Sequence, residues 1–183
     1  MTSTEAKASD GSRSATLSPI GAVLRGVVAG AVGTAALDTL QFLRYRRGGG
    51  GGSSATDWES SKGLSSWEDA PAPAQVGRRL TEGLFDTKIP PSDARLVNNV
   101  THWAFGTLSG ALYGLIAGSL RKQRVVYGLP FGASVWAGGY VVLPAAKLYK
   151  PIWEYDAKTL ATDLSGHLVY GLTTATTMRL LSA

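Results

Sequence analysis

The sequence predicts an all-α fold, an integral membrane bundle of four transmembrane helices with a short interfacial helix in the first loop. The chain has 183 residues, of which 44% are hydrophobic and only 17% charged, and 23 are glycine. Apolar segments of about 20 residues, the length that crosses a bilayer, recur four times along the chain. Basic residues gather where these segments end, as they do in membrane proteins. The net charge of +5 therefore predicts no nucleic-acid partner.

The elements follow in chain order. Residues 1–18 are polar, carry no apolar core of a signal peptide, and are expected to form a disordered tail. The membrane domain is expected over residues 19–181, with a glycine linker and interfacial loop at residues 44–96. Its predicted spans are about 19–43, 97–120, 125–148 and 159–181. A soluble helical bundle is the alternative, but it would need polar faces on these helices.

The loop between the first two spans differs in composition from the rest of the chain. Gly48 to Gly52 form a flexible linker, and Trp58 and Trp67 are expected to anchor the loop at the membrane interface. Apolar residues then recur at helical spacing between Gln75 and Phe85. This pattern predicts a short helix lying in the interface; an ordinary solvated loop helix is the alternative.

Small residues recur at every fourth position, so each of three helices carries one smooth face. They are Ala22, Gly26, Gly30 and Thr34 in the first span, Gly106, Gly110, Gly114 and Gly118 in the second, and Gly171 and Ala175 in the last. In lipid such faces let helix backbones approach closely. The pattern predicts helix-to-helix contact, either within one chain or between copies in an oligomer.

Each of these faces also carries ionisable residues. His102 and His167 lie near the starts of two spans that must run parallel, and Asp38 lies near the end of a span that runs the opposite way. Asp163 lies one turn before His167, and Tyr140 belongs to the third span. Asp38, His102 and His167 therefore belong to one side of the membrane, and Asp163 shares a helix face with His167. These four residues are expected to form a polar or ion-pathway cluster, to which the third span could add Tyr140.

Three interpretations of the cluster stay open. The histidines and aspartates could pair to fix helix register, or form a proton or ion pathway, because histidine titrates near neutral pH. A haem or divalent metal held by His102 and His167 is the third, although two isolated histidines match no metal motif. No cofactor is expected. The sequence has no cysteine, no phosphate-binding loop and no nucleophile elbow, so no enzyme is predicted.

Two histidine motifs resemble a known family. Thr101-His102-x-x-Phe105, with Tyr113 further on, is similar to the second spanning helix of YagU-type bacterial inner-membrane proteins. Gly166-His167-Leu168-Val169, with Asp163 before it and Tyr170 after it, resembles their last helix, and Pro151-x-Trp153-Glu154 is also similar. The resemblance implies a compact helical inner-membrane protein without an assigned activity, in which both histidines matter.

Two functions are consistent with these features. One is a channel- or transporter-like protein, oligomeric, with the His/Asp cluster lining a polar route through the bilayer. The other is a non-catalytic accessory subunit that docks on a partner in a larger membrane complex. The resemblance implies a bacterial inner membrane, and the short basic loop at residues 121–124 favours an orientation with both termini in the cytoplasm.

Overall fold

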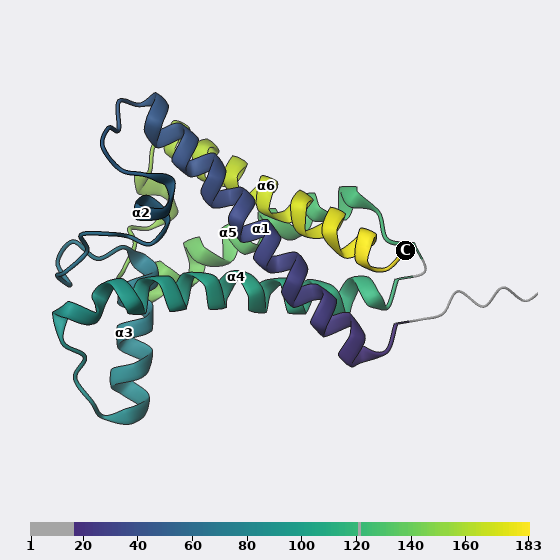
Figure 1. The fold of residues 1–183 in the computed structure, drawn as a ribbon, viewed down its shortest axis with the longest axis horizontal. Coiled ribbons are helices and arrows are strands. Elements are labelled where there is room, and N and C mark those ends of the chain that lie inside the picture. Colours follow the sequence, from purple (N-terminus) through teal and green to yellow (C-terminus); the bar gives the residue numbers. More distant parts are fainter. Residues whose placement is uncertain (1–16, 121) are drawn as a thin grey trace, which may run out of the picture.

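The computed structural model describes residues 17–120 and 122–183, and every regular element in these residues is helical (Figure 1). In chain order the elements are α1 (Pro19–Arg47), α2 (Ala55–Glu59), α3 (Ala72–Phe85), η1 (Pro91–Asp93), α4 (Ala94–Gly118), η2 (Val125–Tyr127), α5 (Gly128–Ala145), η3 (Ile152–Glu154) and α6 (Ala157–Leu181). The prediction of an all-α chain is confirmed for the described part. The tail expected at residues 1–18 lies outside it, apart from its last two residues.

Local chemistry sets where the long helices begin and end. Ser18 caps α1 through its side chain, Pro19 occupies the first helical position, and the glycine run that begins at Gly48 ends the helix. Asp156 caps α6 in the same way. The predicted spans were a few residues off: α1 continues to Arg47, and α5 is shorter than the predicted 125–148 because η2 precedes it and Lys147 adopts a left-handed backbone after it.

The four long helices lie next to one another in the order α4, α1, α6, α5. Helix α1 packs against both α4 and α6, while α5 packs chiefly against α6. Figure 1 shows the start of α1 and the end of α6 at one end of the molecule and α2 and α3 at the other. We call the end that carries α2 and α3 the capped end. It gathers the end of α1, the start of α4, the end of α5 and the start of α6.

The first loop is a small folded cap. Helix α3 contains the predicted segment Gln75–Phe85 and packs against the first turns of α4, where Gly77 lies against Val97 and Thr101. Trp67 is buried with Ala74 and Ala94 and donates to the Ile89 carbonyl. The expectation that Trp67 is an interfacial anchor was therefore wrong, because the loop supplies the tryptophan with an apolar pocket of its own.

Small side chains fill the contact between α1 and α4. A side chain on Gly30 would collide with Gly106 and Gly110 of α4, and one on Gly26 would collide with Gly110 and Gly114. The two glycine faces thus meet within one chain, backbone against backbone. Helices α5 and α6 repeat this contact, with Gly128 and Gly132 facing Gly171 and the His167 carbonyl.

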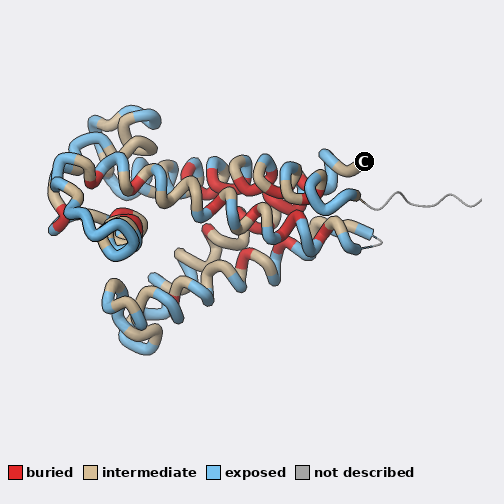
Figure 2. The backbone as a smooth tube through the Cα atoms, turned by 90° about the horizontal axis from the view of Figure 1, so that it is seen from below, coloured by how far each residue is buried: buried red, intermediate tan, exposed pale blue. Residues whose placement is uncertain are grey.

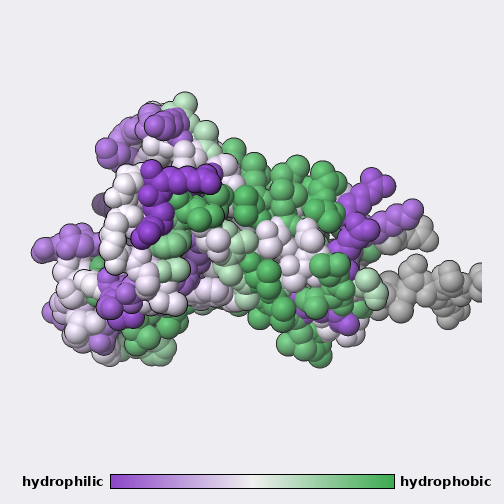
Figure 3. Space-filling model, turned by 45° about the horizontal axis from the view of Figure 1, so that its top comes forward, coloured by the Kyte–Doolittle hydropathy of each residue, from purple (hydrophilic) through white to green (hydrophobic). Residues whose placement is uncertain are grey.

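Large apolar side chains lie on the outside of the helices. Leu24, Val28 and Val32 of α1 are exposed, as are Leu108 and Leu112 of α4. Figure 2 shows the buried residues concentrated along the middle of the long helices. On the face seen in Figure 3, a hydrophobic band separates hydrophilic surface at the two ends of the molecule. This distribution is typical of helices that pack in lipid, where close backbone contact replaces burial of large side chains.

Two of the four predicted spans meet the length and hydropathy expected of a membrane span within the described residues. They are Pro19–Arg47 and Val125–Ala145. Helices α4 and α6 are long enough but too polar. The start of α4 carries Arg95, Asn98, Asn99 and His102. Asp163, His167 and several threonines lower the hydropathy of α6. The described residues therefore contain two candidate spans, and the four-span arrangement stays a prediction.

Candidate functional site

A buried ion pair joins α1 to α4 near the capped end. His102 Nε2 lies 3.0 Å from both carboxylate oxygens of Asp38, and Asp38 is only 4% exposed. The packing of the two glycine faces explains why Asp38 and His102 lie together. Thr34 packs on Gly106, and one turn further toward the capped end each helix presents its ionisable residue, Asp38 on α1 and His102 on α4.

A second pair lies within α6. His167 Nδ1 is 3.0 Å from the Asp163 carbonyl oxygen and 3.4 Å from its carboxylate, with the two residues one turn apart. The backbone carbonyl of His167 faces Gly132 of α5. Helical spacing alone makes this pair, whereas the Asp38–His102 pair needs two helices in register.

The two pairs lie on neighbouring turns at the same end of the bundle. The Tyr170 hydroxyl of α6 donates to the Gly106 carbonyl of α4 at 2.7 Å. Tyr170 is close to one turn beyond His167, and Gly106 is one turn beyond His102. The structure thus arranges four of the predicted cluster residues as two pairs. Tyr140 contacts neither histidine and lies instead near Asp163 and in ring contact with Tyr149 and Tyr155.

The tautomers follow from the hydrogen-bond partners. A carboxylate and a backbone carbonyl only accept hydrogen bonds, so the proton of His102 lies on Nε2 and that of His167 on Nδ1. In the neutral form of each imidazole the other nitrogen, Nδ1 in His102 and Nε2 in His167, carries no proton. These are the atoms that could take up and release a proton.

The segment that contains α2 covers the Asp38–His102 pair. Trp103, next to His102, donates from Nε1 to a Glu59 carboxylate oxygen at 3.0 Å. Asn99 Nδ2 and Arg95 Nε donate to the Ser60 carbonyl at 2.9 and 2.8 Å. Three side chains from the first turns of α4 therefore hold this short segment in place.

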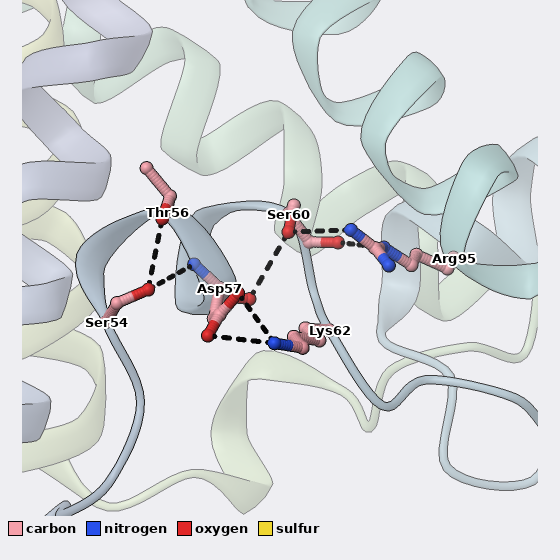
Figure 4. A network of polar contacts seen from close by, with 6 residues as sticks. All are labelled: Ser54, Thr56, Asp57, Ser60, Lys62 and Arg95. Carbon is pink, nitrogen blue, oxygen red and sulfur yellow. Dashed lines mark hydrogen bonds and ion pairs between the residues drawn. The ribbon is translucent and has the colours of Figure 1, made fainter.

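Polar contacts also stiffen the segment itself (Figure 4). Ser54 caps α2, Lys62 pairs with Asp57 at 3.1 Å, and Arg95 reaches the Ser60 hydroxyl from α4. Trp58 packs against Phe42 and Tyr45 of α1 on the other side. Trp58 is half-buried in this contact, and its role as an interfacial anchor stays a prediction.

Glu59 lies close to the buried pair. Burial raises the pKa of Glu59, and the negative charge of Asp38 raises it further. Glu59 and Trp103 were missed from the sequence. The Trp58-Glu59 and Trp67-Glu68 dipeptides were visible signals, but a flexible glycine linker separates them from α1, so spacing could not place them over Asp38.

The donor groups do not assemble into a metal site in the described residues. No group of three histidine or carboxylate side chains comes together with metal-binding geometry there. Each histidine instead has one carboxylate partner of its own. In the described part, a haem or divalent metal could therefore be held only by two histidines that are each paired with a separate carboxylate.

Comparison with known proteins gives one match. No curated protein and no solved structure matches the chain significantly. Residues 86–176 match a family described as "Protein of unknown function (DUF1440)". The match covers a little under half of the chain; it includes His102, Tyr140, Asp163 and His167 but not Asp38 or Glu59. From α4 to most of α6, the chain is therefore similar to an uncharacterised family, and the resemblance to YagU-type proteins stays a prediction.

Proposed function

We propose that the chain is a small membrane protein that crosses the bilayer with α1, α4, α5 and α6. The observation that carries this proposal is the inverted packing of the helices. Glycine and alanine lie between α1 and α4, while leucines and valines of both helices face outward. Helices α4 and α6 have the length of a span; His102 of α4 pairs with Asp38 of α1, and His167 of α6 pairs with Asp163 one turn away.

The activity that we infer is proton-dependent transport or conduction, in a channel- or transporter-like protein. An ionisable side chain in the middle of a spanning helix costs about 2.5–3.5 kcal/mol, so its retention favours a role. Both histidine side chains are partly exposed, 31% for His102 and 22% for His167, while they stay paired to carboxylates. We infer that a proton reaches each imidazole through this exposed surface.

The remainder of the bundle is closed in this conformation. Beyond Thr34 the contact between α1 and α4 is backbone against backbone, with no space for a side chain at Gly26, Gly30 or Gly110. We therefore infer that proton access stops at the level of the two histidines in this conformation. Transport requires the long helices to move apart, and protonation of the histidines is the event that we expect to change their contacts.

The test is proton flux in liposomes that contain the purified full chain and a pH-sensitive dye. We expect flux that depends on pH and that falls at least about tenfold in Asp38→Asn and in His102→Gln. Asp69→Asn serves as the control, because Asp69 is exposed and, within the described residues, its carboxylate accepts a hydrogen bond from Ser66 alone. Absence of flux from correctly folded wild-type protein contradicts the proposal.

The same preparation tests the alternatives. A foreign subunit that co-purifies in fixed ratio, together with no flux, favours the accessory-subunit function. A visible absorption band or stoichiometric metal that His102→Ala and His167→Ala both remove favours a cofactor site. The mass of the purified protein also tests the proposed homo-oligomer.

The proposed location is a bacterial inner membrane with both termini in the cytoplasm. The chain has no cysteine, so single cysteines report sidedness without background. We expect Ser182→Cys to be labelled from the cytoplasmic side and Ser65→Cys, in the cap, from the opposite side. Reversed labelling would show that the basic residues of the cap, such as Arg78 and Arg79, determine the orientation.

A further inference from the structure

A cleft of about 640 Å³ opens at the capped end, and one of its lining residues, Asp163, also belongs to the pair with His167. Its residues come from the end of α1, the end of α5 with the turn that follows, and the first turns of α6. Because α6 packs against both α1 and α5, its first turns contribute lining residues to both sides of the cleft. The volume lies in the range of small-molecule sites.

The wall on the α1 side is cationic. Arg44 crosses from α1 to α6, where its Nη atoms donate to the Thr162 carbonyl at 3.0 Å and to Ser165 Oγ at 2.9 Å. Lys158 lies one turn before Thr162, on the same face of α6, and also lines the cleft. Two positive charges thus line one side of the opening.

The wall on the α5 side is aromatic and acidic. Tyr140, Tyr149 and Tyr155 form a cluster with ring centroids 5.4–6.2 Å apart. Asp163 of α6 lies beside them. Burial and the negative charge of Asp163 raise the pKa of Tyr149, so its phenol stays neutral. Aromatic faces next to a carboxylate attract ammonium groups.

We propose that this cleft binds a zwitterionic headgroup, a phosphate ester that also carries an ammonium group. The phosphate would lie on Arg44 and Lys158, and the ammonium on the tyrosines and Asp163. Because one side of the cleft is cationic and the other is aromatic and acidic, a zwitterion fits it better than a simple anion. The remaining carboxylate of the cleft, Asp156, is engaged in capping α6.

The position of the cleft favours a membrane lipid as the source of this group. It lies where three of the proposed spans end, at the depth of lipid headgroups, and the adjoining turn carries exposed Trp153 together with Lys147 and Lys150. The choice of a lipid rests on the membrane location proposed above but not on proton transport. The free phosphate ester has the same chemistry and is the other source to be tested.

The experiment measures which lipid the full chain retains. The protein is placed in nanodiscs of equal parts phosphatidylethanolamine and phosphatidylglycerol, and the lipids that remain bound are counted by native mass spectrometry. The test variants are Lys158→Gln and Tyr149→Ala, and neither replaces a member of the two histidine pairs. Lys88→Gln and Tyr127→Ala, both outside the cleft, are the matched controls.

We expect the wild type to retain phosphatidylethanolamine in preference to phosphatidylglycerol. The preference should fall about threefold in each test variant and stay unchanged in the controls. Lys158 is exposed, so its replacement leaves the fold intact and keeps the test decisive. A preference for phosphatidylglycerol, or equal retention in wild type and Lys158→Gln, would overturn the proposal.

A second arm separates the two sources. Free O-phosphoethanolamine is titrated onto the detergent-solubilised protein, with binding followed by calorimetry. Binding that Lys158→Gln weakens supports the same chemistry with a soluble ligand. Lipid retention without binding of the free ester supports the lipid. Failure of both arms rejects the cleft as a headgroup site and leaves the flux experiment unaffected.

Discussion

The contact between α1 and α4 changes character along its length. Toward the chain termini, glycines bring the two backbones together, and Gly30 has no room for a side chain beside Gly106 and Gly110. At the capped end the same two faces carry Asp38 and His102, which form a paired, partly exposed site. One continuous face of each helix thus serves two purposes: close packing fixes the register, and the register sets the ion pair.

The two histidine pairs differ in what holds them. Asp38 and His102 come from different helices and meet only when the glycine contact is formed. Asp163 and His167 are neighbours on one helix, and His167 keeps a backbone partner in addition to the carboxylate. The first pair therefore reports on tertiary packing, and the second reports on helix formation alone.

The largest effect is expected from filling the glycine contact. Gly110→Leu places a side chain against Gly30 and Gly26, so α1 and α4 must separate. We expect the free energy of unfolding in mild detergent to fall by at least about 3 kcal/mol. Gly138→Ala on α5 is the control, because nothing lies within 4 Å of the added methyl group. Equal stability of the two variants would show that the glycine face is not a close contact.

Smaller losses of stability are expected when the carboxylate of either histidine pair is removed, and the two losses should differ. Asp38→Ala leaves His102 without its acceptor, and we expect a loss of about 2 kcal/mol, below the ~3–5 kcal/mol for fully buried pairs because His102 is partly exposed. Asp163→Ala should cost only about 0.5 kcal/mol, since His167 keeps its bond to the backbone carbonyl. Thermal unfolding in detergent measures both. The reverse order would make the α6 pair the structural one.

The smallest effect concerns the cap and its dependence on pH. The pKa of Glu59 is raised above its ordinary 4.5, so the cap binds more protons when it is docked on α4 than when it is detached. Docking is therefore strongest below pH 4.5. It weakens as the pH rises through the raised pKa of Glu59. Asp38 and His102 are the ionisable groups that face Glu59. Hydrogen exchange of residues 55–61, corrected for intrinsic rates, should therefore increase with pH.

A pair of variants sharpens this prediction. Glu59→Gln removes the charge that opposes Asp38, so exchange of the cap should become nearly independent of pH. Glu68→Gln, in the second Trp-Glu dipeptide, is exposed and should behave like the wild type. A pH-dependent opening that survives in Glu59→Gln would assign the effect to another group.

Several features could be predicted from sequence because they depend on neighbours along the chain. The fourfold spacing of glycines predicted a smooth face on α1 and α4, and the spacing of Asp163 and His167 predicted a pair on one turn of α6. Helix α3 followed from the apolar spacing between Gln75 and Phe85. The argument that parallel and antiparallel spans bring Asp38 and His102 to one end used only chain direction.

Other features depended on contacts that spacing does not encode. The glycine linker lets the cap reach many positions, so only the hydrogen bonds from α4 place Glu59 over Asp38. Trp67 was taken for an anchor at the membrane surface, but the loop folds into a pocket that buries it. The approach of Arg44 and Tyr140 to one cleft likewise results from how α1 and α5 pack on α6.

The sequence by itself determined the helical class of the described residues, the small face of each packing helix, and the end at which the ionisable residues gather. These properties follow from period and chain direction, which act over a few residues. The tertiary structure decided which carboxylate each histidine pairs with, what covers the pair, and where a ligand could enter. Those choices depend on the rotation and separation of helices, which are set by contacts between residues far apart in the chain.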